Sequence, residues 1–470
     1  MFLKYSSLKI IFLLFFVCPS FVSSQNIPKP VAKPEIIKKR YFDLFNEIKK
    51  QNWQIAKSIA NDYDDKILFH FVIWLDITRP GSKHSFKYLT NFLKNNSDWP
   101  MEELIKKKVE ISIDKTVSDE KIYDWFLNNK PLTVKGKIDF FETKIRLGKI
   151  NNKTQEVKKI WINEDLTYSQ QRYFIKKYNK FWDNEDNWKR FDRLLWEGKT
   201  VSARRTLKRI YGDLRKLGNA RLALSTRSPN VSSMIKKVPG YLKNDPGLVY
   251  ERMRWRRKAK LDTAADFLFE PPENIMNHRN WWINARIVIR RLINREKYEK
   301  AYRLLSNHKI PINTISGSEA EWLAGWVSLT FLNKPQLALD HFGLLYNNVE
   351  HPSSKSKAAY WIATAMKKKK DSSIDIQKWH EVSSQYKHSF YSQNSSIKIG
   401  NFDFPRIEIK QSKPSCCVHF LKIIDILISN GEEKKIFPFL LKSFQLSKNI
   451  EEKNFLMNFA KNLKNKNHLI

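Results

Sequence analysis

Apolar residues recur with the period of an α-helix along most of this chain. The segment around residue 320 is typical: it carries Trp322, Leu323, Trp326 and Leu329 at positions i, i+1, i+4 and i+7. This spacing places all four side chains on one face of a helix with about 3.6 residues per turn. A strand-like alternation occurs at 109–113, but it lies in a helical neighbourhood and stays ambiguous. The pattern therefore predicts an all-α protein.

The predicted helices form pairs of similar length. Trp282, Trp322 and Trp361 follow one another at intervals of 40 and 39 residues. Ala301 and Ala338, small residues suited to a close crossing of two helices, are 37 residues apart. Repeats of about 34 to 45 residues are typical of α-solenoids of the tetratricopeptide or HEAT kind. Because the copies are irregular, the sequence predicts a tetratricopeptide-like α-superhelix of helix pairs rather than one named repeat.

The N-terminus has the features of a secretory signal peptide at 1–24. Lys4 and Lys9 precede a short apolar run at 10–17, and small residues around Ser24 resemble a cleavage site. The alternative is a membrane anchor, which needs about 20 apolar residues, and this run is shorter. We therefore expect cleavage after the signal, a leader segment at 25–40, and no membrane span in the mature chain.

Export to the periplasm changes the meaning of the strong positive charge. The chain carries 85 Lys and Arg against 48 Asp and Glu, a formal net charge of +37. In the cytosol this excess would favour nucleic-acid binding. In the periplasm the available anions are envelope polymers such as peptidoglycan, with its carboxylates, and lipid headgroups. We therefore expect peptidoglycan as a partner and no nucleic acid, while the lysine run at 367–370 fits a solvated helix end.

Composition and motif searches exclude several kinds of chemistry. Gly makes up only 13 of 470 residues, and neither GxxxxGK[ST] nor GxGxxG occurs, which argues against a phosphate-binding glycine loop. Three Cys are too few for a disulfide scaffold, and the adjacent Cys416 and Cys417 are expected to be free thiols. His380 lacks the second His of an H-E-x-x-H motif. We expect no metal and no cofactor.

Two clusters that mix aromatic and basic residues form the candidate groove for glycan or peptide. Their members are Arg254, Trp255, Arg257, Trp281, Trp282 and Arg286. In one interpretation the aromatic rings stack on sugar faces while the arginines pair with peptide carboxylates. In the other, the tryptophans fill the core between helix pairs and the arginines are solvated. Both interpretations stay open at this point.

Seven phrases stand in the order and with the spacing found in one protein family. They are NFLKNNSDWP (91–100), DWFLNNKPLTVKGK (124–137), RFDRLLWEGKTVSARR (190–205), VYERMRWRRKAKLDTAADFLFEPP (249–272), NWWINARIVIRRLINREKYEKAYRLLSNH (280–308), SEAEWLAGWVSLTFLNKPQLALDHF (318–342) and SKAAYWIATAM (356–366). Together they resemble the α-helical superhelix of the soluble lytic murein transglycosylases. The resemblance runs from about residue 41 to about residue 393, and more loosely to the C-terminus.

This resemblance implies a periplasmic protein that acts on peptidoglycan. Members of the family cleave glycan strands between N-acetylmuramic acid and N-acetylglucosamine and leave 1,6-anhydro ends. A U-shaped superhelix and a linker region precede their lysozyme-like catalytic domain, in which one Glu protonates the glycosidic oxygen. For this chain the resemblance implies a superhelical domain at 41–395 and linker-type helices at 396–470.

The catalytic motifs of the family are not found in these 470 residues. The family's Glu is followed by Ser, and a Gly-Leu-Met-Gln phrase comes later, whereas this sequence contains neither Glu-Ser nor Met-Gln. Near its C-terminus the remaining acids, which sit beside Lys and fit solvated surface, are Glu432, Glu433, Glu451 and Glu452. No catalytic residue is therefore assigned, and we expect the chain to lack activity alone and to work with a separately encoded catalytic domain. The open alternatives are a non-catalytic murein-binding protein and a tetratricopeptide-like envelope scaffold.

Overall fold

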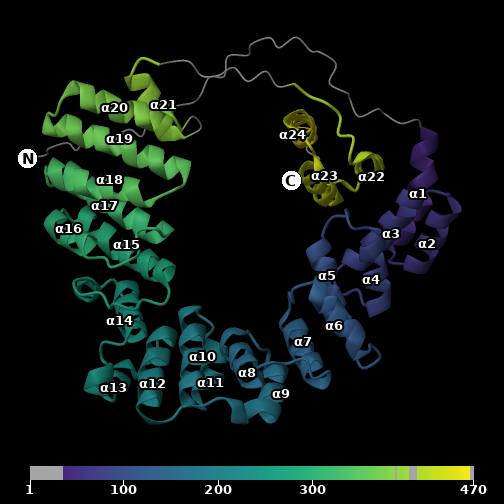
Figure 1. The fold of residues 1–470 in the computed structure, drawn as a ribbon, viewed down its shortest axis with the longest axis horizontal. Coiled ribbons are helices and arrows are strands. Elements are labelled where there is room, and N and C mark those ends of the chain that lie inside the picture. Colours follow the sequence, from purple (N-terminus) through teal and green to yellow (C-terminus); the bar gives the residue numbers. More distant parts are fainter. Residues whose placement is uncertain (1–34, 387–388, 402–409, 466–470) are drawn as a thin grey trace, which may run out of the picture. The chain divides into compact units, whose positions relative to one another are not determined.

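The computed structural model describes residues 35–386, 389–401 and 410–465, and within these ranges the chain forms helices and no strands (Figure 1). The predicted all-α fold is confirmed. The ambiguous stretch at 109–113 falls almost entirely within helix α5 (Glu102–Ser112). The predicted signal peptide at 1–24 and the first part of the leader lie outside the described residues.

By their internal contacts the residues group into two compact units, which we describe separately. The first comprises Met1–Thr116 together with Glu408–Ile470, and the second comprises Val117–Ile407. The helices of the first unit are α1 (Glu35–Lys49), α2 (Trp53–Asp62), α3 (Lys66–Thr78), α4 (Phe86–Asn95), α5, α22 (Val418–Ser429), η4 (Glu433–Lys435), α23 (Phe437–Leu446) and α24 (Ile450–Asn465).

The second unit contains the longer helical array. Its helices are α6 (Asp119–Asn128), α7 (Val134–Arg146), α8 (Lys153–Asn163), α9 (Tyr168–Tyr178), η1 (Asn179–Phe181), α10 (Asn184–Trp196), α11 (Thr200–Leu207), α12 (Gly212–Thr226), α13 (Val231–Lys236), η2 (Gly240–Leu242), α14 (Pro246–Lys258), η3 (Asp262–Leu268), α15 (His278–Asn294), α16 (Tyr298–Ser306), α17 (Ile315–Thr330), α18 (Pro335–Asn348), α19 (Pro352–Lys369), α20 (Ser373–Ser384) and α21 (Phe390–Lys398). Consecutive helices pack on one another along this unit, as expected of a solenoid (Figure 1).

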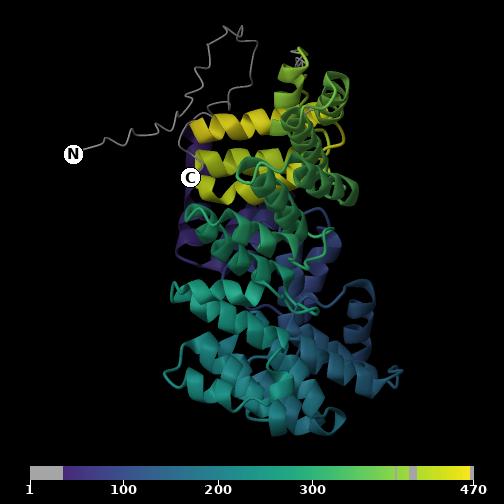
Figure 2. The ribbon, with the colours of Figure 1, turned by 90° about the vertical axis from the view of Figure 1, so that its left-hand side faces the viewer.

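In the first unit, helices from the two ends of the chain share one core. Helices α22, α23 and α24 lie side by side (Figure 2), and α22 contacts α3. The ring of Phe420 on α22 lies 5.9 Å from that of Trp99, and both rings are buried. The predicted boundary between a superhelix ending at 395 and linker helices beginning at 396 stays a prediction.

Glu452 corrects one expectation about the C-terminal acids. Its side chain is buried, whereas the sequence indicated solvated surface. The carboxylate accepts hydrogen bonds from the backbone N–H of Ser415 at 3.2 Å and of Lys448 at 2.9 Å. These bonds lower the pKa of Glu452 against the opposing effect of burial. The carboxylate thus ties the first turn of α24 to the segment that precedes α22.

The ends of many helices are fixed by side chains that the sequence places at the first turn. Thr167 and Gln170 form a reciprocal capping box at the start of α9, and Asp183 and Asp186 form another at the start of α10. Proline occupies the first turn of α14, α18 and α19, where its missing N–H costs nothing. These caps satisfy backbone donors that would otherwise have no partner.

Small residues allow the helix pairs of the second unit to approach closely. Ala301 and Ala338, the two predicted crossing residues, are both fully buried. A Cβ atom on Gly325 of α17 would lie 2.5 Å from the ring of Phe342 on α18, so only glycine fits at that contact. The core of α14–α17 continues through Trp281, Ala324 and their neighbours.

No helix of the described residues is long and apolar enough to cross a membrane. Cys416 and Cys417 are free thiols whose Sγ atoms are 3.4 Å apart, far from disulfide bonding distance.

Candidate functional site

Two members of the predicted groove, Trp281 and Trp282, are buried in the structure. Trp281 and Trp282 are 1% and 2% exposed and belong to the core formed by α14–α17. Trp282 Nε1 donates a hydrogen bond to Glu319 Oε2 at 2.7 Å, and Arg286 pairs with the same carboxylate. Neither ring face is open to a ligand, so these tryptophans hold the helix pairs together.

The other predicted groove residues lie on α14 and are partly engaged in its packing. Arg254 pairs with the buried Glu251 at 3.1 Å. Burial raises the pKa of Glu251, and Arg254 acts in the opposite direction. Trp255 is half-buried against the core of α12 and α13. Burial and the neighbouring Arg291 lower the pKa of Arg257. A ligand-binding role for this cluster stays a prediction.

Two adjoining hollows in the second unit flank helix α11. The α9–α11 hollow has a volume of about 730 Å³, and its lining includes Tyr168, Arg172, Arg205, Arg209 and Tyr211. The α11–α13 hollow has a volume of about 280 Å³, and its lining includes Arg204, Arg215, Asn219, Leu222 and Met234. Lys208 lines both hollows and so marks where they meet.

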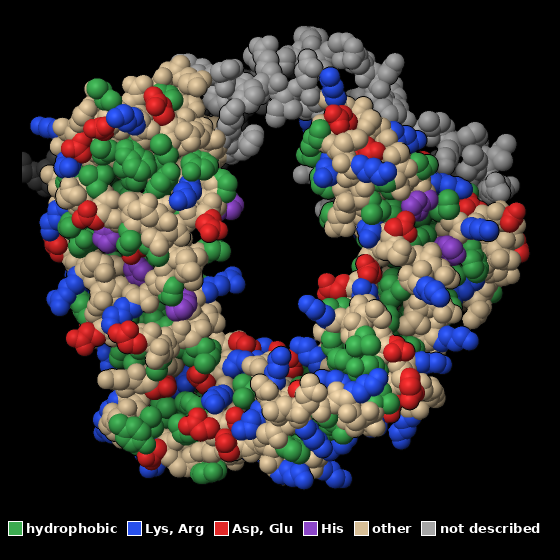
Figure 3. Space-filling model, in the orientation of Figure 1, with side chains coloured by type: hydrophobic (Ala, Val, Ile, Leu, Met, Phe, Trp, Pro, Cys, Tyr) green, Lys and Arg blue, Asp and Glu red, His purple; other side chains and the backbone are tan. Residues whose placement is uncertain are grey.

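The chemistry of both hollows is dominated by cations. Asp183 contributes the one carboxylate among the lining residues, and it already faces Lys158 at 3.8 Å. Arg204, Lys208, Arg209 and Arg215 are exposed and have no ion-pair partner among the residues that the structure describes. Exposed cations without partners, gathered around concave surface, attract anionic ligands. Figure 3 shows Lys and Arg side chains along the edge that α9 forms.

Fixed packing holds the walls of the hollows in place. Arg221 on α12 is buried and pairs with Asp192 of α10 at 2.6 Å and with Asp245, which caps α14, at 3.4 Å. These two ion pairs fix α12 between α10 and α14. Gly247 allows the contact, because a Cβ there would lie 2.0 Å from the Arg221 guanidinium.

Hydrogen bonds fix several lining residues of the α9–α11 hollow. Arg205 Nε donates to Gln171 Oε1 at 2.8 Å. The backbone N–H of Tyr211 donates to Asn184 Oδ1 at 3.1 Å. The Tyr168 and Tyr211 side chains are 59% and 66% exposed. The guanidinium groups of Arg172 and Arg205 each lie 5.8 Å from the centre of the Tyr168 ring.

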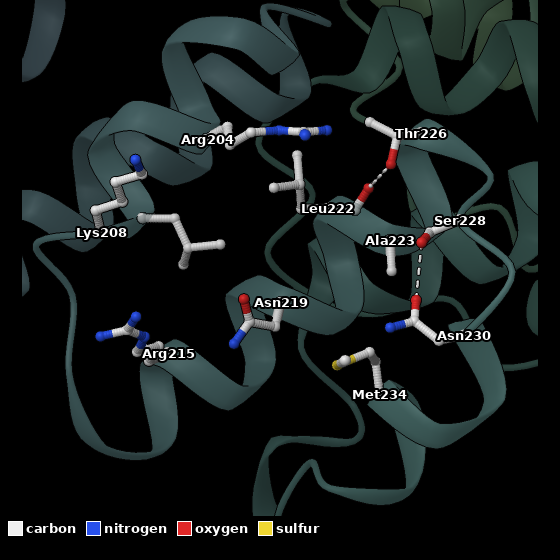
Figure 4. A pocket seen from close by; sticks show the side chains of 11 residues that line it. Arg204, Lys208, Arg215, Asn219, Leu222, Ala223, Thr226, Ser228, Asn230 and Met234 are labelled. Atoms are coloured by element: carbon white, nitrogen blue, oxygen red, sulfur yellow. Dashed lines mark hydrogen bonds between the residues drawn. The ribbon is translucent and has the colours of Figure 1, made fainter.

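In the α11–α13 hollow, polar side chains and the apolar side chains of Leu222, Ala223 and Met234 surround an open centre (Figure 4). Lys208, Arg215 and Asn219 lie on one side, and Thr226 and Asn230 on the other. Thr226 Oγ1 donates to the carbonyl of Leu222 at 2.8 Å. Its lining thus combines an apolar patch with cations at the rim.

A buried polar cluster elsewhere in the second unit does not form a metal site. Glu321 accepts hydrogen bonds from His308 Nε2 at 2.9 Å and His341 Nδ1 at 2.7 Å, and Tyr302 Oη lies 3.1 Å from His341 Nε2. Burial alone would raise the pKa of Glu321, but the two histidine bonds lower it to about 2. No group of side chains within the described residues is arranged to hold a metal ion.

Carboxyl groups with raised pKa are held by cations, as in structural ion pairs. Burial raises the pKa of Asp245, which faces Arg221 and caps α14. Burial also raises the pKa of Asp139, whose carboxylate lies 2.6 Å from Lys135 Nζ. A general acid needs a raised pKa together with access to substrate. Asp139 and Asp245 have the raised pKa but are engaged by neighbouring cations.

Sequence reasoning missed the hollows around α11, although a signal was present. Arg204 and Lys208 are four residues apart, as are Arg205 and Arg209. Residues at this spacing on a helix lie on the same side, so each pair predicts a basic stripe. In the structure α11 ends at Leu207, and Lys208 and Arg209 lie in the turn after it.

Comparisons with known proteins point to one fold. No protein-family model matches the sequence, and no curated protein matches it. Among solved structures, the complex of the 70-kDa soluble lytic transglycosylase with bulgecin A matches with a TM-score of 0.62 at 13% identity, covering 93% of this chain and 70% of that chain. The 70-kDa soluble lytic transglycosylase from Escherichia coli gives a TM-score of 0.58 at 13% identity, with the same coverage.

A third structure extends the match to another organism. An inactive mutant of the lytic transglycosylase Slt from Pseudomonas aeruginosa gives a TM-score of 0.61 at 12% identity, covering 91% of this chain and 69% of that chain. The resemblance that the sequence phrases indicated is thus confirmed at the level of the fold. This chain has the superhelical all-α fold of the soluble lytic transglycosylases.

Proposed function

We propose that this protein is a periplasmic, peptidoglycan-associated component of the lytic transglycosylase system, whose superhelix holds murein. The observation that carries the proposal is the fold match over 93% of the chain to structures named as lytic transglycosylases. The signal-like sequence at 1–24 supports a periplasmic location, where murein is the abundant anionic polymer.

The chemistry of the hollows around α11 fits this ligand. Murein stem peptides carry carboxylates, and its glycan offers sugar rings. Exposed arginines without ion-pair partners suit carboxylates, because the guanidinium forms two parallel charge-assisted hydrogen bonds with them. Exposed tyrosines give flat apolar faces that sugars can cover.

We further propose that these 470 residues hold murein rather than cleave it. The sequence contains neither the Glu-Ser nor the Met-Gln dipeptide of the family's catalytic motifs. The raised-pKa carboxyls Asp139, Asp245 and Glu251 are each engaged by a neighbouring cation. Cleavage would therefore depend on catalytic residues outside these 470 residues.

Sedimentation with purified murein sacculi tests the binding half of this proposal. The mature chain should pellet with sacculi and stay in the supernatant without them. A chain of unchanged helical content that remains in the supernatant at low salt would overturn the proposal.

Product analysis of the same mixture tests the catalytic half. The supernatant should contain no 1,6-anhydromuropeptides after prolonged incubation, whereas an active lytic transglycosylase should release them as a positive control. Release of these products by the purified chain would show that it cleaves murein itself.

A further inference from the structure

We propose that the two hollows around α11 divide the ligand between them: the α9–α11 hollow takes a sugar ring of the glycan strand, and the α11–α13 hollow takes the acidic stem peptide attached to it. This inference rests on the proposed murein binding. It adds where on the protein murein binds and which hollow takes the glycan or the peptide. It concerns residues outside the groove that the sequence predicted.

Helix α11 and the turn that follows it carry cations toward both hollows. Arg204 lines the α11–α13 hollow, while Arg205 and Arg209 line the α9–α11 hollow, and Lys208 lines both. Arg204 and Arg205 lie on the helix, and Lys208 and Arg209 lie in the turn after Leu207. A ligand that bridges the hollows would pass Lys208, which has no ion-pair partner among the described residues.

The α9–α11 hollow has the side chains that saccharide recognition uses. It is the larger of the two, at about 730 Å³ against about 280 Å³. Tyr168 and Tyr211 are exposed and line it, as does the exposed amide side chain of Asn179. Aromatic faces cover the apolar face of a sugar, while amides can donate to and accept from its hydroxyls.

The α11–α13 hollow suits a short acidic chain with small apolar groups. Leu207, Leu222 and Met234 line it together with the cations Arg204 and Arg215. Alanine-like side chains of a stem peptide fit these apolar side chains, and its carboxylates fit the arginines. No carboxylate of the protein lines this hollow to compete for them.

Paired variants separate the two hollows. Arg204→Glu/Arg215→Glu changes the α11–α13 hollow, and Tyr168→Ala/Tyr211→Ala changes the α9–α11 hollow. All four side chains are exposed, so both variants should keep the wild-type helical content and melting temperature. Lys121→Glu/Lys367→Glu is the matched charge control, because both lysines are exposed in the second unit outside the hollows.

Two forms of murein serve as probes: intact sacculi, and glycan strands whose stem peptides an amidase has removed. We expect Arg204→Glu/Arg215→Glu to weaken binding to intact sacculi about tenfold or more and to leave binding to bare glycan within about twofold. Tyr168→Ala/Tyr211→Ala should weaken binding to both probes, and the lysine control should match wild type on both.

The outcomes distinguish this inference from the proposed function. If wild type binds neither probe, the proposed function fails. If wild type binds sacculi and both hollow variants bind as well as the lysine control, murein binding stands and the hollows are not its site. If the arginine variant loses bare glycan as strongly as intact sacculi, the division between sugar and peptide is wrong.

Discussion

The indole ring of Trp74 on α3 packs against the phenyl ring of Phe439 on α23, with ring centroids 4.6 Å apart. Phe439 is fully buried and also contacts Phe71 and Phe420. Trp74 Nε1 donates a hydrogen bond to the carbonyl of Pro100 at 2.8 Å, which fixes the orientation of the indole. One aromatic core thus joins helices from the beginning and the end of the chain.

Removing Phe439 should unfold the first unit more easily. Phe439→Ala leaves a cavity among buried rings and should lower the free energy of unfolding by about 3–5 kcal/mol. Phe437→Ala is the control, because Phe437 is 59% exposed on the same helix and its loss should cost about 0.5 kcal/mol or less. Denaturant titration followed by tryptophan fluorescence measures both, and equal effects would contradict a shared core.

The Glu321 cluster should make the second unit sensitive to acid. The folded state lowers the pKa of this carboxyl to about 2, so its stabilising contribution is complete above the unfolded value near 4.5. That contribution should be lost progressively as the pH falls from about 4.5 to about 2. Glu321→Gln should reduce stability at neutral pH and flatten the pH dependence in this window, as thermal melts across the pH range would show. An unchanged slope would contradict the assignment.

Trp281 should matter for stability and not for ligand binding. Trp281→Phe keeps an apolar ring but leaves a gap in a packed core, so the melting temperature should fall while sacculus binding per folded molecule stays at the wild-type level. The readouts are a thermal melt and sedimentation at a temperature where both proteins are folded. A variant with wild-type stability and lost binding would restore the interpretation of Trp281 as a sugar platform.

Binding through exposed cations should weaken as salt increases. The cations around α11 are solvent-accessible, and mobile ions screen such charges over about 10 Å at 0.1 M ionic strength. Sacculus affinity should therefore fall steadily between about 0.05 M and about 0.5 M salt. Affinity that does not change with salt would point to apolar contacts instead.

Local patterns in the sequence were sufficient to predict the helix pairs. The apolar stripe with Leu323 and Leu329 predicted α17. Ala301 and Ala338 were predicted as crossing residues and are fully buried. These features depend on neighbours within a few turns, and periodicity reports such neighbours directly.

Long-range packing and concave surface had no comparable signal. Trp74 and Phe439 are far apart in the chain, and neither segment has a pattern that identifies the other as its packing partner. From the sequence, Trp282 could stack on a sugar or pack in a core. Its burial in the structure shows that it packs in a core. The hollows around α11 are lined by residues from helices α9 to α13. The basic residues were readable in the sequence, but the space between these helices was not.

The most direct test of the account compares sacculus binding by Lys208→Glu/Arg209→Glu and by Lys121→Glu/Lys367→Glu. Both variants change the net charge equally, but only the first alters the hollows around α11. We expect the first variant to lose affinity about tenfold or more and the second to bind like wild type, with melting temperatures unchanged in both. Equal affinity of the two variants would contradict the claim that the surface around α11 holds murein.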